Sequence, residues 1–174
     1  GTDDTATVIA ACGGERVRVV EACERRGASY ARNTGAAAAR APLVAFCDAD
    51  DIVADDWLVE LLRHRNSSVV AGAAIAFDDP FSLAEIDRAT AVVPGNDYDF
   101  WQSVYSNNML VHRSAFEAIG GFDLDLSHCE DTDLAWRLQL AGYEITTAPN
   151  SIIYYRQRST SRGKWLQFHR WCRT

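Results

Sequence analysis

The sequence predicts an α/β protein: an α/β/α sandwich around a mostly parallel central sheet. Two continuous apolar runs, LVAFC at 43–47 and SVVAGAAIAF at 68–77, have strand length and the composition of strands buried on both faces. Segments with helical periodicity separate and follow these runs, as in a sheet covered by helices on both sides. Carboxylates follow the first run directly, which is where open α/β sheets bind ligands.

The individual elements follow from stop signals, capping patterns and periodicity. Gly13-Gly14 ends the first predicted helix and Pro42 the second, while Ser114 and Glu117 have the spacing of a capping box. Helices are expected at 2–12, 31–41, 54–65, 114–121 and 130–143, and strands at 16–20, 43–47, 68–77, 108–113, 143–147 and 151–155. Residues 78–106, rich in Asp, Pro, Gly and aromatics, are expected to form a lid or an acceptor loop.

Length and charge limit the function classes. A chain of 174 residues fits one domain. The net charge of −7 argues against a nucleic-acid partner. No acidic residue follows Glu144, so residues 161–174 form a predicted basic amphipathic segment that could contact anionic lipid or an acceptor diphosphate. An ordinary solvated helix explains this segment equally well.

Cysteine usage and hydropathy favour the cytoplasm. The five cysteines are odd in number and show no CxxC spacing. The sequence shows no signal peptide, and its longest apolar stretch, VVAGAAIAF, is too short to span a bilayer. The expected location is therefore cytoplasmic, with a peripheral contact at the inner face of the membrane through the basic segment.

Three carboxylates close the first buried run, in the stretch FCDADD at 46–51. Like charges this close repel one another, so such a cluster indicates a cation partner. Oxygen ligands on a short loop suit Mg²⁺ or Mn²⁺, above all where phosphates complete the coordination shell. Alternatively, Asp51 or Asp55 caps the following helix, but this alternative leaves Asp48 and Asp50 unexplained.

A second acidic cluster, HCEDTDLAWR at 128–137, opens a predicted helix. Carboxylates at a helix N-terminus are stabilised by the helix dipole, and Asp133 can pair with Arg137 four residues later. The functional alternative is that one carboxylate among Glu130, Asp131 and Asp133 removes a proton from a hydroxyl, because crowding raises the pKa of one member of the cluster. Spacing alone does not decide between the two.

The stretch ARNTG at 31–35 is a third candidate. An arginine at a helix N-terminus can hold a phosphate or a base edge, which is the functional interpretation of Arg32. The alternative is a surface arginine, with Asn33 as the helix cap. The four histidines show no metal-ligand spacing and are expected to be structural or superficial.

The order of these motifs resembles that of the family 2 glycosyltransferases, which have the GT-A fold. The resemblance runs over most of residues 24–148 and rests on several motifs in the right order. They are Arg-Asn-x-Gly at 32–35, Asp-x-Asp at 48–50, Gly-Gly-Phe-Asp at 120–123 and Glu-Asp at 130–131. The resemblance implies a Rossmann-like α/β/α sandwich that transfers a sugar, with inversion, from a nucleotide-sugar donor to a hydroxyl of a glycan or lipid-linked acceptor.

The resemblance also implies roles on the donor side. Asp50 corresponds to the ligand of a Mg²⁺ or Mn²⁺ ion that bridges the donor diphosphate. Asp48 corresponds to a contact with the ribose or sugar, and Arg32 to a nucleotide contact. Asn33 and Ala49 fall within the same motifs and are assigned to the same nucleotide-sugar site.

On the acceptor side, Asp131 corresponds to the general base that activates the acceptor hydroxyl. Glu130, Trp136 and Arg137 are expected to shape the acceptor site. Such an enzyme is expected to act in cell-surface glycan or glycolipid synthesis.

The sequence departs from the family pattern at two places. The strand–helix–strand unit of about 40 residues that normally opens the domain has no counterpart, so residues 1–174 are predicted to be a single GT-A domain that is N-terminally incomplete. Residues 153–156 read Ile-Tyr-Tyr-Arg where many members supply a metal-binding histidine, so the third metal ligand is unassigned. The alternative function is a non-catalytic remnant of this fold that acts as a binding or assembly module.

Overall fold

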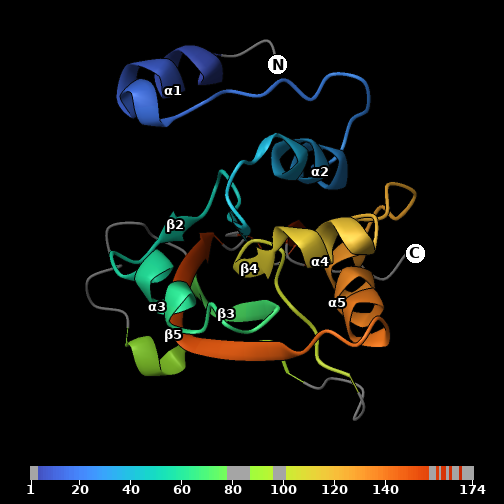
Figure 1. Ribbon diagram of the computed structural model, residues 1–174. Coiled ribbons are helices and arrows are strands. Elements are labelled where there is room, and N and C mark those ends of the chain that lie inside the picture. The colour runs from blue at the N-terminus through green and yellow to red at the C-terminus, as the bar shows by residue number, and fades with distance from the viewer. Residues whose placement is uncertain are drawn as a thin grey trace.

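A computed structural model describes residues 4–77, 87–95 and 101–156, together with positions 160, 162, 163, 165 and 169 of the tail. The described strands form a five-stranded sheet in the spatial order β1-β4-β3-β5-β2 (Figure 1). The strands are β1 (Leu43–Phe46), β2 (Ile52–Val53), β3 (Val69–Phe77), β4 (Met109–His112) and β5 (Ile145–Arg156). The α-helices are α1 (Thr5–Gly13), α2 (Ala28–Ala38), α3 (Trp57–Arg63), α4 (Arg113–Ala118) and α5 (Glu130–Leu140), with 3-10 turns η1 (Gly14–Arg16) and η3 (Arg88–Thr90).

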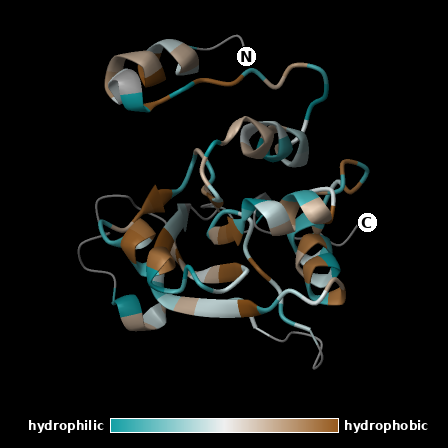
Figure 2. Ribbon diagram, in the orientation of Figure 1, coloured by the Kyte–Doolittle hydropathy of each residue, from teal (hydrophilic) through white to brown (hydrophobic). Residues whose placement is uncertain are grey.

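The sheet is covered on both faces, as the apolar runs predict. Val69 and Ala71 of β3 pack with Leu134 of α5 in one cluster, whereas Val70 between them packs with Leu61 of α3 in another. Successive side chains of a strand point to opposite faces, so these two clusters are the two sides of an α/β/α sandwich. Figure 2 shows the corresponding apolar colouring on β4 and on parts of α3 and α5. Each fully buried leucine contributes roughly 2 kcal/mol to this packing.

Strand direction is the main correction to the predicted sheet. The sheet was expected to be mostly parallel, but among the described strands the pairs β1–β4, β3–β4 and β2–β5 are antiparallel. β3 and β5 pair in parallel. An apolar run buried on both faces has the same composition whichever way its neighbours run, so hydropathy does not encode direction.

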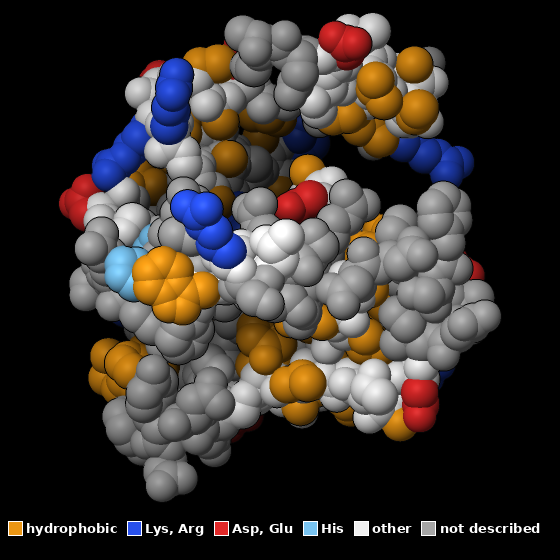
Figure 3. Space-filling model, turned by 180° about the vertical axis from the view of Figure 1, so that it is seen from behind, with side chains coloured by type: hydrophobic (Ala, Val, Ile, Leu, Met, Phe, Trp, Pro, Cys, Tyr) orange, Lys and Arg blue, Asp and Glu red, His pale blue; other side chains and the backbone are white. Residues whose placement is uncertain are grey.

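The predicted strand at 16–20 is absent. After η1 the backbone of Val17 is extended, but no ladder forms on this segment, and Val17, Val19 and Val20 are 48 %, 50 % and 42 % exposed. Alternating β-branched residues form a strand only where a neighbouring edge is available. Helix α1, which precedes this segment, buries none of its residues, and its apolar side chains lie open at the upper right of Figure 3.

Several smaller expectations also change. The strands predicted at 143–147 and 151–155 form the single strand β5. Helix α4 begins at Arg113 without a side-chain cap, so the capping box at Ser114 is wrong. The predicted loop 78–106 and the predicted segment 161–174 lie partly outside the described residues. In the part of the chain that the structure describes, no helix is long and apolar enough to cross a membrane.

Candidate active site

The first acidic patch consists of Asp48, Asp50 and Asp51, in the turn that joins β1 to β2. β1 ends at Phe46, and the N–H of Asp51 donates to the carbonyl of Asp48 at 3.3 Å, which closes the turn. Burial raises the pKa of Asp51 to about 6, and the neighbouring Asp48 and Asp50 add to the rise.

The same crowding acts on the residue before the patch. Burial, followed by the charge of Asp51, raises the pKa of the Cys47 thiol to about 11. At neutral pH the Cys47 thiol is therefore protonated, and a protonated thiol is a weak metal ligand. The carboxylates are thus the strongest ligands of the patch.

The second acidic patch consists of Glu130, Asp131 and Asp133, in the first turn of α5. Cys129 precedes the helix in the left-handed conformation, with φ of 58°, and so turns the chain sharply into the patch. The pKa of Asp131 is raised, first by burial and then by the charge of Glu130, although the backbone N–H of Thr132 donates to its carboxylate at 2.8 Å. Asp133 pairs with Arg137 at 2.6 Å, as the four-residue spacing predicts.

The two patches open onto one cleft of about 980 Å³. Asp50 and Asp51 line it from the first patch, and Glu130 and Asp131 line it from the second. Between the two patches in sequence lie almost eighty residues, and the sheet brings them together. The fold thus places both acidic clusters at a common opening.

Arg32 ties the two patches together. Its guanidinium donates to Asp48 Oδ1 at 2.7 Å and to Glu130 Oε1 at 3.0 Å, and it lies 5.5 Å from the centre of the Phe122 ring. The side chain is 12 % exposed and lines the cleft. A planar, permanently charged fork of donors suits such a bridge. Its nucleotide contact stays a prediction, because these N–H groups are engaged with carboxylates here.

Asn33 is hydrogen-bonded to the backbone of Phe122 and is not among the described residues that line the cleft. Its Nδ2 donates to the Phe122 carbonyl at 2.8 Å, and its Oδ1 accepts the Phe122 N–H at 2.9 Å. Gly121, with φ of 71°, permits this contact, since a Cβ there would lie 2.6 Å from Asn33 Oδ1. Asn33 is also inside α2, so the alternative reading of it as a helix cap is wrong. The motifs at 32–35 and 120–123 therefore pack on each other.

The remaining predicted site residues separate into two groups. Ala49 lines a smaller hollow of about 620 Å³ between α2 and β1, next to Asp48. Trp136 and Arg137 are not among the described residues that line the cleft. Trp136 meets Trp101 edge to face at 6.1 Å. The acceptor role expected of Trp136 and Arg137 stays a prediction.

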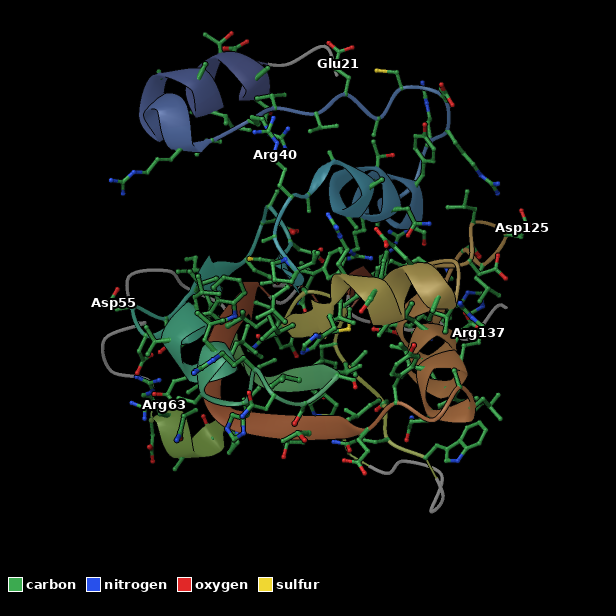
Figure 4. All side chains as sticks on the ribbon, viewed as in Figure 1. Glu21, Arg40, Asp55, Arg63, Asp125 and Arg137 are labelled. Carbon is green, nitrogen blue, oxygen red and sulfur yellow. The ribbon has the colours of Figure 1, made fainter. Side chains whose placement is uncertain are left out.

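Arg137 instead joins α5 to the segment that follows α4. Its guanidinium donates at 2.8 Å to the carbonyls of Ile119 and Gly121, in addition to its pair with Asp133. In Figure 4 Arg137 lies beside α5, on the opposite side of the molecule from Asp55 near α3. Its hydrogen bonds hold Gly121 in place for the contact with Asn33.

The segment 103–107 is the part of the cleft that sequence reasoning missed. Residues 103–106 fell within the expected loop 78–106 and Asn107 directly follows it, but none of these residues was assigned a role. Asn107 Nδ2 donates to Asp51 Oδ2 at 2.6 Å, and the backbone N–H of Ser106 donates to Asp131. The signal that could have found it is the pair Asn107-Asn108 directly before the apolar run at 109–111, since buried amides need partners.

The carboxylates fit a cation that is shared with a ligand. Within residues 4–77, 87–95 and 101–156, no three His, Cys, Asp or Glu side chains are grouped so that they alone could hold a metal ion. Mg²⁺ and Mn²⁺ sites that use one or two carboxylates are completed by water and by phosphates of the substrate. The first acidic patch matches that kind of site and not an all-protein cage.

Comparison with known proteins identifies the family of the chain. The Glycosyl transferase family 2 model matches residues 1–120. The pre-mycofactocin glycosyltransferase of Mycobacterium tuberculosis is 29 % identical over 164 residues, which cover 86 % of this chain and 34 % of that protein. The poly-beta-1,6-N-acetyl-D-glucosamine synthase of Staphylococcus epidermidis is 25 % identical over 162 residues, which cover 84 % of this chain and 38 % of that protein. The chain thus spans little more than a third of the length of these relatives.

The fold has a solved counterpart. The mannosyltransferase PcManGT from Pyrobaculum calidifontis, in complex with GDP-Man and Mn²⁺, superposes with a TM-score of 0.65 at 22 % identity, covering 96 % of this chain and 48 % of that one. This likeness shows the GT-A fold. Together with the family match over residues 1–120, it leads to one conclusion: the chain belongs to the family 2 glycosyltransferases.

Proposed function

We propose that the cleft transfers a sugar from a nucleotide-sugar donor to an acceptor hydroxyl, with inversion and with the help of a divalent cation. The observation that carries the proposal is that Asp50 and Asp131 line one cleft. One carboxylate group is then available to a cation and the other to a proton. Family membership supports the reaction class.

On the donor side, Asp50 is the cation ligand, with Asp48 and Arg32 beside it. A Mg²⁺ or Mn²⁺ ion there would offset the negative charge that builds on the departing nucleoside diphosphate. The related PcManGT binds GDP-Man and Mn²⁺, which supports a donor of the nucleotide-sugar class. Asp48 and Arg32 are already paired at 2.7 Å, so Arg32 holds Asp48 in place from the start.

On the acceptor side, Asp131 is the general base. The acceptor oxygen forms a bond to the anomeric carbon while the bond to the diphosphate breaks, and the hydroxyl proton passes to the Asp131 carboxylate. A raised pKa brings a carboxylate closer to the value that proton transfer near neutral pH requires, and burial raises the pKa of Asp131 in this way. Glu130, held by Arg32 at 3.0 Å, borders the same end of the cleft.

For the acceptor we propose a cell-surface glycan or a lipid-linked precursor, reached from the cytoplasmic side of a membrane. The related synthase of Staphylococcus epidermidis builds a polymer of N-acetyl-D-glucosamine, as its name states. The basic residues of 161–174 would meet anionic lipid. Removing residues 161–174 should abolish sedimentation with anionic liposomes and leave behaviour with uncharged liposomes the same; unchanged binding to the anionic ones would end this part of the proposal.

The proposal is tested by titrating UDP and GDP with and without Mn²⁺. The wild-type chain should bind at least one of them more tightly when Mn²⁺ is present, and Asp50→Ala should lose about tenfold or more of that affinity because a charged oxygen ligand is gone. Asp55→Ala is the matched control, since Asp55 is exposed and lies outside the cleft lining. Equal affinity of wild type and Asp50→Ala would refute the assigned role.

A second candidate is a module that binds through the same cleft without turnover. The ion pairs of Arg32 favour it, because they engage Asp48 and Glu130 before any ligand arrives. This candidate predicts no gain in nucleotide affinity on adding Mn²⁺, so the same titration separates the two functions.

A further inference from the structure

Asn108 is a fully buried polar residue directly before β4. Its Nδ2 donates to the carbonyls of Ala73 and Ser151, each at 2.8 Å, and its Oδ1 accepts from Trp57 Nε1 at 2.8 Å. A buried amide with all of these bonds made is costly to move, because every displaced group would lose its partner. Asn108 thereby joins β3, β5 and α3 at one point.

That point is an irregularity in the central pair of strands. Gly72 pairs with Ala148 and Ala73 pairs with Ile152, so the register of β3 against β5 shifts between Gly72 and Ala73. Such a shift interrupts the ladder of backbone hydrogen bonds, and the Asn108 amide bonds carbonyls of both strands there. Gly72 leaves room for it, since a Cβ would lie 2.3 Å from the carboxamide.

The two residues before Asn108 reach the two acidic patches. Asn107 Nδ2 donates to Asp51 Oδ2 at 2.6 Å in the first patch. The backbone N–H of Ser106 donates to Asp131 in the second. Three consecutive residues thus connect the core of the sheet with both sides of the cleft.

We propose that Asn107 is a positioning residue: it holds Asp51, and through it the first acidic patch, at a fixed separation from Asp131, while Asn108 anchors it to the sheet. The inference rests on the proposed function and adds to it a residue that fixes the distance between the two acidic patches. The reacting groups in a transfer reaction must meet within a fraction of an ångström, and a misplacement of about 1 Å can cost roughly 100-fold in rate. A carboxylate turn on a surface has no such precision unless a neighbour restrains it.

The test replaces Asn107 by leucine, which has similar size and no N–H donor. Asn107→Leu should lower kcat about tenfold or more with a smaller change in KM, because the loss is one of geometry in the transition state. Asn66→Leu, at an exposed position on the loop after α3, is the matched control and should change neither constant. Asn107→Gln keeps the donor and should recover part of the lost kcat.

A second readout does not depend on turnover. Amide hydrogen exchange at Ser106 should be about tenfold or more faster in Asn107→Leu than in wild type, at equal melting temperature, because the loop has lost one of its two anchors. Unchanged exchange at Ser106 would overturn the positioning role. If wild type shows no turnover and no Mn²⁺-dependent nucleotide binding, the proposed function fails, and the exchange comparison alone decides whether Asn107 restrains the cleft.

Discussion

Arg32 sets the electrostatics of the cleft at the scale of single residues. With 12 % of its side chain exposed, it forms ion pairs with Asp48 and Glu130 at once and offsets part of their combined charge. Asp50, Asp51 and Asp131 have no such arginine bridge among the described ion pairs. These three carboxylates of the cleft are therefore the ones available to bind a cation or to accept a proton.

Asp131→Asn should remove turnover and preserve donor binding. The amide is close to the carboxylate in shape but does not accept the hydroxyl proton, so we expect kcat to fall at least about 100-fold. Affinity for the Mn²⁺–nucleoside diphosphate should stay within about twofold, since the cation site lies on the first patch. Asp125→Asn is the control, since the Asp125 side chain is 90 % exposed and its ion pair among the described residues is with Arg25. Full turnover by Asp131→Asn would contradict its role as the base.

Asp51 should make stability depend on pH. Its pKa rises from 3.8 to about 6 on folding, so between these values the folded protein holds a proton that the unfolded chain has released. The free energy of unfolding therefore falls as pH rises through this window. Asp51→Asn should flatten that slope in urea denaturation with EDTA present, and the exposed Asp55→Asn should not. Parallel slopes for wild type and Asp51→Asn would show that burial does not raise this pKa.

At the scale of elements, α2 and the α4–α5 connection lock together through one amide. Asn33 exchanges two hydrogen bonds with the backbone of Phe122, and Arg137 holds Gly121 from the other side. Phe122 then lies under Arg32. The placement of the bridging arginine thus depends on a contact between helix α2 and the loop after α4, which are far apart in sequence.

Two adjacent glycines give a matched test of this contact. Gly120 and Gly121 have φ of 80° and 71°, so alanine is strained at both. A Cβ on Gly120 meets nothing within 4 Å, whereas one on Gly121 meets Asn33 Oδ1 at 2.6 Å. Gly120→Ala should cost about 1 kcal/mol of unfolding free energy and Gly121→Ala about 2–3 kcal/mol, measured by denaturant titration. Equal losses would mean that the Asn33 contact adds nothing.

What the sequence predicts at this scale depends on whether a partner is local. β3 was predictable because nine residues that are almost all buried leave a continuous apolar run. The pair Asp133–Arg137 was predictable because helical geometry fixes its spacing. The absence of a strand at 16–20 was not predictable, because the alternation of apolar and polar residues does not show whether a neighbouring strand edge exists. The hydrogen bond from Asn107 to Asp51 was not predictable either, because the two residues are 56 positions apart in the sequence.

At the scale of the whole molecule, the predicted layers agree with the structure, and the predicted strand directions do not. The acidic clusters were found because like charges gather only where something offsets them, and that signal survives in a single sequence. The Asn108 junction and the Arg32 bridge depend on the register of β3 with β5 and on the position of α5. Register and position arise only on folding, so no local pattern records them.

The central claim is that one cleft holds a cation at Asp50 and a base at Asp131. Anomalous diffraction at the manganese edge, from crystals grown with Mn²⁺ and a nucleoside diphosphate, tests it most directly. The account predicts a single manganese peak in contact with an Asp50 oxygen and with the diphosphate, in the opening onto which the Asp131 carboxylate faces. A manganese ion away from Asp50, or a diphosphate bound where Asp131 has no access to it, would contradict the account.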